Sequence, residues 1–156
     1  MQIMRTEVTP VELRLRRPLC LAGKITIDHI HAIFVRIETK ASGSAWGCAV
    51  AHPDLTGESP AHALKACRAC ADMTPDLHPI NLEYSLTQLA PLTKDSPAAA
   101  CAFDLAFHDL LGLAASLPLY RLLGGYRHRI QTSVTLPIVT VDEAVEMAEA
   151  YALSLI

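Results

Sequence analysis

The chain has 156 residues, of which 51% are hydrophobic and 19% charged, and its formal net charge is −3. This composition is typical of a folded globular protein with one domain and room for a small appendage. The basic residues form no cluster that could neutralise a run of phosphates, which argues against nucleic-acid binding. No stretch reaches the ~18 uninterrupted apolar residues of a membrane span, and the N-terminus lacks the apolar core of a signal peptide, so we expect a soluble, cytoplasmic protein.

The first half of the chain has the alternation of polar and apolar residues that is typical of half-buried strands. Apolar residues recur at every second position over residues 11–15 and again over residues 33–37. A short connection at residues 40–44, which contains a glycine, leads to a third apolar segment at residues 45–50. We therefore predict a three-stranded antiparallel meander. Its first connection, residues 17–29, is longer than a hairpin needs and is a candidate functional loop.

The second half of the chain changes to helical periodicity. Ser59 and Ser96 each precede a proline, which offers an N-cap followed by proline in the first helical turn. The second of these pairs begins a long apolar stripe, which predicts a core helix over residues 97–115. Residues 130–138 have the pattern of a strand, and residues 140–143 form a capping box that opens a last helix. The expected fold class is α+β, a meander followed by a helical bundle.

Two residue pairs have spacings that could bind a metal. The CxxC at residues 67–70 lies in a predicted helix, where the two sulfurs share one face and could hold a metal or form a disulfide. His29 and His31 likewise point to one face of a strand. Neither pair has the further ligands that a zinc site needs, so core cysteines and a partly exposed strand start are the simpler interpretation. The odd number of cysteines favours reduced, mostly buried thiols, and no metal ligand is assigned.

The long predicted helix carries Asp104, His108 and Asp109, which are the candidates for acid–base chemistry. Five residues of helix turn the two carboxylates about 140° away from each other, so they cannot serve one site. The histidine has no nucleophile beside it, and a surface or interface position suits it better. Capping, a hydrogen bond or an interface contact is the better interpretation of the carboxylates. Gly124 and Gly125 lack the strand and spacing of a phosphate loop and are expected to end a helix.

Residues 98–125 resemble a signature of the enolase superfamily, in its mandelate racemase and muconate lactonizing enzyme branch. Residues 117–125 (LPLYRLLGG) match that branch's P-L-x-x-L-L-G-G. Residues 98–112 (AAACAFDLAFHDLLG) match its helix motif A-x-D-x-A-x-x-D, at Ala102, Asp104, Ala106 and Asp109. Within the branch, Thr-Gly-Glu-Ser at residues 56–59 and Thr-Ser-Val-Thr-Leu at residues 132–136 look more like dipeptide epimerases than muconate cycloisomerases.

The resemblance implies two domains. Residues 1–125 correspond to an enolase-like N-terminal capping domain, and residues 126–156 to the first strand and helix of an incomplete (β/α)₈ barrel. Such a barrel takes ~250 residues, many more than follow Gly125. The implied protein is the capping, substrate-specificity part of a racemase or epimerase.

The chemistry of this family implies residues that the chain does not contain. A base, often one Lys of a Lys-x-Lys pair, removes the proton α to a substrate carboxylate, and a divalent metal, usually Mg²⁺, stabilises the enediolate. No lysine follows Lys94, and the acidic residues after the last predicted strand all lie on one helix, where they cannot surround a metal. We therefore expect Mg²⁺ in the full-length parent, no cofactor and no catalytic residue in this chain, and no activity from this chain alone.

In this family, two loops of the capping domain help to choose the substrate, and they follow its first and third strands. Here they are residues 18–23 and 51–56. The first would suit an apolar lid that excludes water, with a flexible loop as the alternative. In dipeptide epimerases, the threonine that corresponds to Thr135, in the strand that opens the barrel, faces the ligand. The substrate contacts implied are Leu19, Cys20, Asp54, Thr56 and Thr135.

The partners that this resemblance implies are those of the full-length parent enzyme. Its substrate would be a small carboxylate, with a dipeptide as the leading candidate, and neither nucleic acid nor a membrane is involved. Two alternatives remain open. The parent could resemble a muconate cycloisomerase, or the chain could be a stand-alone module that binds another chain or forms a homo-oligomer through the exposed strand at residues 130–136.

Overall fold

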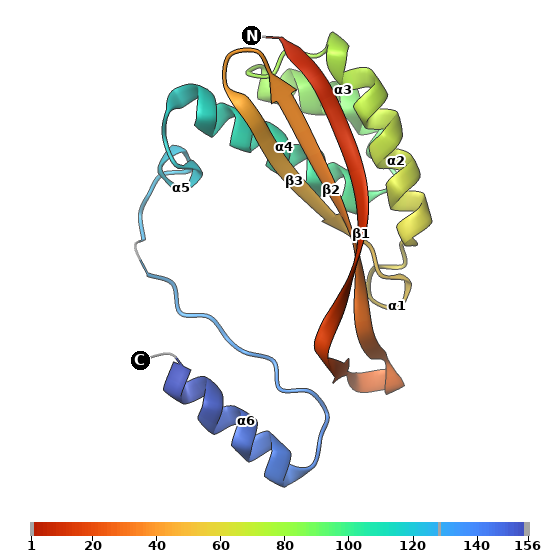
Figure 1. The fold of residues 1–156 in the computed structure, drawn as a ribbon, viewed down its shortest axis with the longest axis vertical. Helices are drawn as coiled ribbons and strands as arrows, with labels where there is room; N and C mark the ends of the chain where they lie inside the picture. Colours follow the sequence, from red (N-terminus) through yellow and green to blue (C-terminus); the bar gives the residue numbers. More distant parts are fainter. Residues whose placement is uncertain (1, 128, 155–156) are drawn as a thin grey trace. The chain divides into compact units, whose positions relative to one another are not determined.

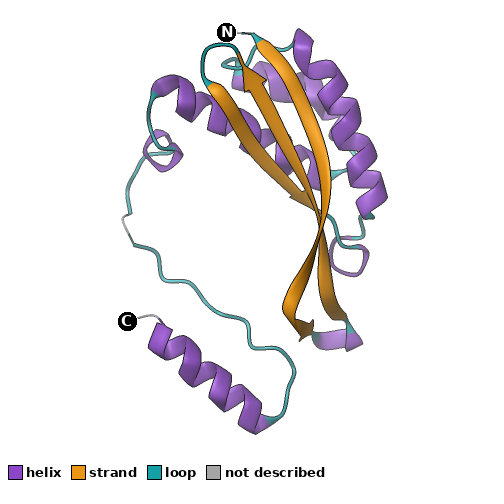
Figure 2. Cartoon of the chain, in the orientation of Figure 1, coloured by secondary structure: helices purple, strands orange, loops and turns teal. Residues whose placement is uncertain are grey.

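The computed structural model describes residues 2–127 and 129–154. Figures 1 and 2 show the helices and strands of the chain. The chain divides into two compact units. Residues 1–13 and 31–125 form the first, here the core unit, and residues 14–30 with 126–156 form the second, here the hairpin unit. The elements in chain order are β1 (Ile3–Cys20), β2 (Thr26–Thr39), β3 (Gly43–Val50), α1 (Pro53–Thr56), α2 (Pro60–Met73), α3 (Leu82–Thr93), α4 (Pro97–Ala115), α5 (Leu119–Leu122) and α6 (Val141–Ser154).

The sheet of the core unit is the predicted three-stranded antiparallel meander, with the order β1-β2-β3. β2 and β3 pair in a register that runs from Ala32 opposite Val50 to Thr39 opposite Gly43. The predicted alternation is confirmed on β2, where Ile33, Val35 and Ile37 are all buried and the residues between them are more exposed. The hairpin between these strands closes at Gly43, whose φ of +77° suits a residue without a side chain.

Helices α2, α3 and α4 cover one face of this sheet and complete the core (Figure 1). The predicted core helix is confirmed as α4, which buries Phe103, Phe107 and Leu110. It lies very close to β3, because a Cβ built on Gly47 would fall 1.8 Å from the backbone oxygen of Ala102. Length and composition alone would allow α4 to cross a bilayer, but a core helix passes the same test, and this one packs on the sheet.

The starts of the core helices follow the predicted capping. The Ser59 side chain accepts a hydrogen bond from the His62 N–H at the start of α2, and Ser96 does the same for the Ala99 N–H at the start of α4. Glu58 adds a second cap to α4. Its buried carboxylate accepts hydrogen bonds from the Ser96 hydroxyl and, at 3.1 Å, from the backbone N–H of Ala98. A negative charge at a helix N-terminus is favourable for the helix dipole.

The C-terminal end of the core unit has the helix stop that the sequence predicts. Gly124 and Gly125 have φ values of +107° and +56°, and they end the short helix α5. The N–H of Gly125 donates to the carbonyl of Tyr120 at 2.8 Å. This pair is therefore a helix stop, as its sequence predicts. The helix α3 lies in a segment for which no element was predicted from the sequence, and it carries Pro91 in its last turn.

The first connection of the meander is much shorter than predicted. β1 continues to Cys20 and β2 begins at Thr26, so the expected loop over residues 17–29 is wrong. The actual turn is closed by a hydrogen bond from the Leu21 N–H to the Ile25 carbonyl, with Gly23 at φ +76°. The apolar alternation lapses at Arg17 and Pro18, but strand pairing uses backbone groups, and β1 lies at the sheet edge, where a proline is tolerated.

The strand predicted at residues 130–138 is also wrong. The described residues between α5 and α6 have no strand. Among the described residues, this segment makes one backbone hydrogen bond, from the Ile138 N–H to the Cys20 carbonyl at 2.9 Å. A strand needs a neighbour that pairs along its length, and the described residues supply one contact point only. The last helix is formed as predicted, from Val141 onward.

Candidate functional site

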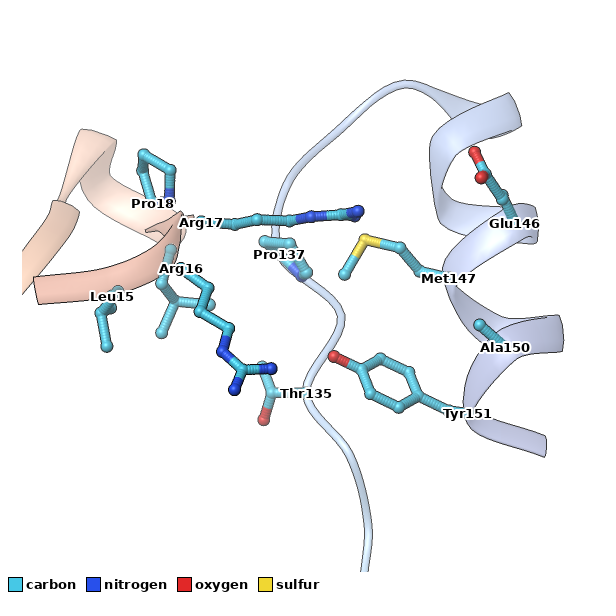
Figure 3. A pocket seen from close by; sticks show the side chains of 11 residues that line it. Leu15, Arg16, Arg17, Pro18, Thr135, Pro137, Glu146, Met147, Ala150 and Tyr151 are labelled. Atoms are coloured by element: carbon cyan, nitrogen blue, oxygen red, sulfur yellow. The ribbon is translucent and has the colours of Figure 1, made fainter. Parts of the chain in front are cut away.

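One pocket lies entirely within the hairpin unit and has a volume of about 460 Å³. Its walls come from the end of β1, the irregular segment before α6, and α6 itself (Figure 3). The lining residues are Leu15, Arg16, Arg17, Pro18, Leu19, Thr135, Pro137, Glu146, Met147, Ala150 and Tyr151. Apolar side chains predominate, and the polar groups among them are two guanidinium groups, one carboxylate and two hydroxyls. Such a mixture is typical of pockets for small organic ligands.

Two local features hold the walls of this pocket in place. The hydrogen bond from Ile138 to Cys20 ties the irregular segment to the end of β1. The capping box begins α6: the Thr140 hydroxyl donates to Glu143 Oε2 at 2.7 Å, and the Thr140 N–H donates to the same oxygen at 3.0 Å. The Glu143 N–H in turn lies 3.4 Å from the Thr140 hydroxyl oxygen. These contacts connect residues that sit next to the pocket in sequence.

Of the three arginines at residues 14–17 of β1, Arg16 and Arg17 line the pocket. The charge of Arg14 is among the causes that lower the pKa of Asp28, after a hydrogen bond from His29. Hydrogen bonds from Thr140 lower the pKa of Glu143, and the charge of Arg17 acts in the same direction. Arg16 forms no ion pair or hydrogen bond with any residue that the structure describes. Arg17, the other cation that lines the pocket, forms none with the described residues either.

The structure brings together two of the predicted substrate contacts. Leu19 and Thr135, which are 116 positions apart in the numbering, both line this pocket. Cys20 follows Leu19 but is not a lining residue, and its Sγ lies 3.9 Å from the Thr26 hydroxyl. The roles of these residues in substrate binding stay predictions.

Asp54 and Thr56, the other two predicted contacts, lie in α1 of the core unit. Asp54 is exposed in the first turn of this short helix. The Thr56 hydroxyl donates to the His52 carbonyl at 3.0 Å and accepts from the backbone N–H groups of His52 and Glu58. The hydroxyl is thus engaged by its own loop. The substrate role predicted for these two residues is untested.

Arg16, Arg17 and Tyr151 also line the pocket, and none of them is among the site residues predicted from the sequence. The signal available for the arginines was two adjacent basic residues before a proline in the first connection. Tyr151 lies on a helix with no distinctive motif, so its neighbours depend on where that helix packs. Figure 3 shows its hydroxyl directed toward the hairpin side of the pocket.

The CxxC pair is part of the core, as its simpler interpretation predicts. Cys67 and Cys70 are both free thiols with no exposed surface. Burial raises the pKa of Cys67 to about 12 and that of Cys70 to about 11. Because the thiolate is the nucleophile and the metal ligand, these cysteines are unreactive near neutral pH.

Among the residues that the structure describes, no three His, Cys, Asp or Glu side chains come together around a possible metal position. His29 lies 2.5 Å from Asp28, and His31 lies 3.8 Å from Glu12, so each faces a carboxylate. The described part of the chain therefore does not by itself fit the Mg²⁺ that the family resemblance implies.

The charged residues of α4 have structural partners. Asp109 accepts a hydrogen bond from the backbone N–H of Trp46 at 3.0 Å, which satisfies one donor of β3. His108 Nδ1 lies 2.9 Å from the Asp104 carbonyl oxygen and 3.4 Å from its carboxylate. The two aspartates thus have different neighbours, in agreement with their predicted separation.

Comparison with known proteins identifies relatives for nearly the whole chain. Residues 3–124 match the family model described as the N-terminal domain of mandelate racemase / muconate lactonizing enzyme. The chain is 32% identical over 150 residues to a hydrophobic dipeptide epimerase of Enterococcus faecalis, a match that covers 94% of this chain and 42% of that protein.

Two solved structures extend this comparison. A dipeptide epimerase from Enterococcus faecalis in complex with Mg and the dipeptide L-Leu-L-Tyr matches with a TM-score of 0.87 at 30% identity, over 95% of this chain and 42% of that one. A dipeptide epimerase from Methylococcus capsulatus in complex with Mg and L-Arg-D-Lys matches with a TM-score of 0.81 at 33% identity, over 98% of this chain and 44% of that one. The chain thus spans less than half the length of these relatives.

Proposed function

The chain belongs to the mandelate racemase / muconate lactonizing enzyme family, and from this premise we propose that it forms the capping domain and first barrel segment of a dipeptide epimerase. One observation carries the proposal. The similarity to dipeptide epimerases covers 94% to 98% of the chain in the three comparisons, which is more than the expected capping domain of residues 1–125. A protein that shared only the capping fold would match as far as about Gly125.

The reaction proposed for the parent is epimerisation, in which a proton is removed from the carbon α to a carboxylate and returned to the opposite face. We assign the base and the metal ligands to the part of the relatives that this chain does not cover. The Mg in the two epimerase complexes supports Mg²⁺ for the parent. The proposed contribution of this chain is to substrate choice, through Leu19 as an apolar wall and Thr135 as a hydroxyl.

A muconate cycloisomerase is the other parent that the family name allows. The relatives described above, at 30% identity or more, are all dipeptide epimerases. The Thr-Ser-Val-Thr-Leu segment at residues 132–136, which resembles that subgroup, places Thr135 in the pocket. These two observations favour the epimerase.

A stand-alone interaction module is a second candidate, because the hairpin unit exposes apolar side chains. Tyr126 is 88% exposed, Ile130 75% and Val141 79%. Exposed apolar side chains are typical of a protein–protein contact where they form one contiguous patch. Light scattering during gel filtration, over a hundredfold range of concentration, tests this candidate. A constant monomer mass would count against it, and a mass that rises with concentration would support it.

The epimerase proposal is tested by activity together with the coding sequence. Reading the gene past the codon for Ile156 should reveal a segment with Lys-x-Lys and acidic strand ends. The protein encoded by the whole reading frame should exchange the α-proton of a dipeptide for deuterium in D₂O, and EDTA should stop the exchange, whereas the 156-residue chain should be silent. Exchange by the 156-residue chain, or none by the longer protein with a panel of dipeptides and Mg²⁺, would contradict the proposal.

A further inference from the structure

The connection between β3 and α2 in the core unit begins and ends at a buried residue. Ala51, which follows β3, is 2% exposed, and Glu58, near the start of α2, is 7% exposed. The residues between them are more exposed and include the one-turn helix α1. Leu55 in this helix is 54% exposed, and Asp54 beside it is also exposed. We call residues 51–58 the α1 turn.

The Thr-Gly-Glu-Ser sequence at residues 56–59 supplies many of the hydrogen bonds of the α1 turn. The Thr56 hydroxyl donates to the His52 carbonyl at 3.0 Å and accepts from the backbone N–H groups of His52 and Glu58. Gly57, at φ +74°, ends α1 with a backbone hydrogen bond of 3.0 Å. All of these bonds lie within the turn, so a different contact has to hold the turn against the rest of the core unit.

Glu58 connects the α1 turn to a distant part of the chain. Its carboxylate accepts hydrogen bonds from the Ser96 hydroxyl and from the Ala98 N–H, which are 38 and 40 positions further along. Both donors lie at the start of α4. A second contact lies next to them in sequence, where His62 Nε2 is 3.1 Å from the Asp95 carbonyl oxygen. Hydrogen bonds to a buried carboxylate are strong, because the charge has no water to replace a lost donor.

We infer that Glu58 is a positioning residue, which fixes the α1 turn on the start of α4 and so holds Asp54 and Leu55 in one arrangement without a ligand. The bonds of the turn use backbone groups and the Thr56 hydroxyl. The Asp54 carboxylate forms no ion pair with any residue that the structure describes, which leaves it for contact with another molecule. A turn that is ordered beforehand loses less conformational entropy when a ligand binds.

The first test is spectroscopic and uses the 156-residue chain. In ¹⁵N relaxation measurements, the amides of residues 55–57 should have order parameters of about 0.85, the value of rigid backbone, and Glu58→Ala should lower them to about 0.6 or less. Glu58→Gln is the conservative variant. Its amide oxygen can accept from the Ala98 N–H and its NH₂ group can donate to the Ser96 hydroxyl oxygen, so the order parameters should stay at the wild-type values.

A control in the core separates positioning from a general loss of stability. Ile37→Val removes a buried methyl group from the end of the β2–β3 pair that lies away from the α1 turn, and it should leave the order parameters of residues 55–57 unchanged. If Glu58→Ala does not fold, Glu58→Asp decides, because its carboxylate is one methylene too short to reach both donors. Low order parameters in the wild type, no loss in the Glu58 variant, no rescue by Glu58→Gln, or an equal loss in Ile37→Val would each overturn the inference.

The second test concerns the substrate and rests on the proposed function. In the longer protein, Glu58→Ala should raise the KM for a dipeptide about fivefold and change kcat by less than about twofold, because a mobile turn costs binding entropy but does not touch the reacting atoms. Glu58→Gln should restore the KM. An unchanged KM in Glu58→Ala, or a fall in kcat alone, would overturn the role in substrate binding. No epimerase activity at all would contradict the proposed function, and the order parameters would still decide whether Glu58 positions the turn.

Discussion

The core unit and the hairpin unit differ in how their residues are held. In the core unit, side chains from the sheet and three helices bury one another, including Phe103, Phe107 and Ile33. In the hairpin unit, Ile27 is the buried hydrophobic residue among those described, and it is not part of the core cluster. The hairpin unit is held by backbone and capping hydrogen bonds. Burial of apolar area is the larger source of stability, so substitutions in the two units should differ in effect.

The largest expected loss of stability comes from the tightest contact of the core unit, which is between Gly47 and Ala102. Gly47→Ala would place a methyl group 1.8 Å from the Ala102 backbone oxygen, and backbone cannot rotate aside as a side chain can. We expect a loss of more than ~5 kcal/mol in the free energy of unfolding, which is on the order of the whole stability of a small domain. Circular dichroism and urea denaturation measure this. Cys48→Ala, at the next position on β3, is the control and should cost less than ~1 kcal/mol.

A large side chain from each unit tests the comparison directly. Phe107→Ala removes a fully buried ring from α4 and should lower the free energy of unfolding by ~3–5 kcal/mol. Val145→Ala truncates a side chain of α6 that is 52% exposed, and should change it by less than ~0.5 kcal/mol. Urea denaturation followed by tryptophan fluorescence gives both values. Similar losses for the two variants would mean that the hairpin unit has a core of its own.

We expect loss of the Glu58 cap of α4 to have an intermediate effect on the free energy of unfolding. Glu58→Ala leaves the Ser96 hydroxyl and the Ala98 N–H without their buried acceptor, which should cost ~1–3 kcal/mol. The same denaturation experiment measures it. Glu83→Ala, which removes an exposed carboxylate from the first turn of α3, is the control and should be nearly neutral. An equally small loss for both would show that the buried cap adds little to the stability of the core unit.

In the hairpin unit, the capping box predicts a smaller and local effect. Thr140→Ala removes the hydroxyl that bonds Glu143 and should destabilise α6 by ~1 kcal/mol. Amide hydrogen exchange in residues 141–150 should speed up, while exchange in α4 should not change. Thr140→Ser keeps the hydroxyl and should restore protection. Faster exchange in α4 as well would show that the two units unfold together.

The same capping box predicts a pH dependence of α6. Hydrogen bonds from the Thr140 hydroxyl and N–H hold the pKa of Glu143 below its ordinary value of 4.5. A carboxylate with a lowered pKa stabilises the folded helix above its ordinary pKa, and this contribution is lost as the pH falls through the folded value. The Cα chemical shifts of residues 141–146 should therefore stay constant from pH 7 to pH 5 and lose helical character at lower pH. Glu143→Gln should remove this transition, and its persistence would assign the transition to another group.

The elements of the core unit could be predicted from the sequence because their signals are local. Alternation over residues 33–37 specifies a half-buried strand, and Ser96 followed by Pro97 specifies a helix start. The matched helix motif then identified the family. Each of these signals depends on residues within one turn or one strand, so no knowledge of distant neighbours was needed.

The errors fall in the hairpin unit, where the outcome depends on partners. The pattern of residues 130–138 is compatible with a strand, but a strand forms only with a neighbour to pair with, and here Ile138 alone bonds to Cys20. The end of β1 was predicted to be part of a long loop because the segment contains Pro18 and Gly23, yet the strand continues to Cys20. In both places, backbone pairing decided the structure, and side-chain pattern is a weak guide to it.

The sequence by itself therefore determined the fold class, the capped helices, the core thiols and the family, because each follows from the order of neighbouring residues. Only the tertiary structure decided which residues share a pocket. Leu19 and Thr135 were expected to face a substrate, but their meeting with Arg16, Arg17 and Tyr151 depends on how the end of β1, the irregular segment and α6 pack within the hairpin unit. Contacts between residues more than a hundred positions apart are specified by packing and by a few backbone hydrogen bonds, and neither leaves a pattern at any one place in the sequence.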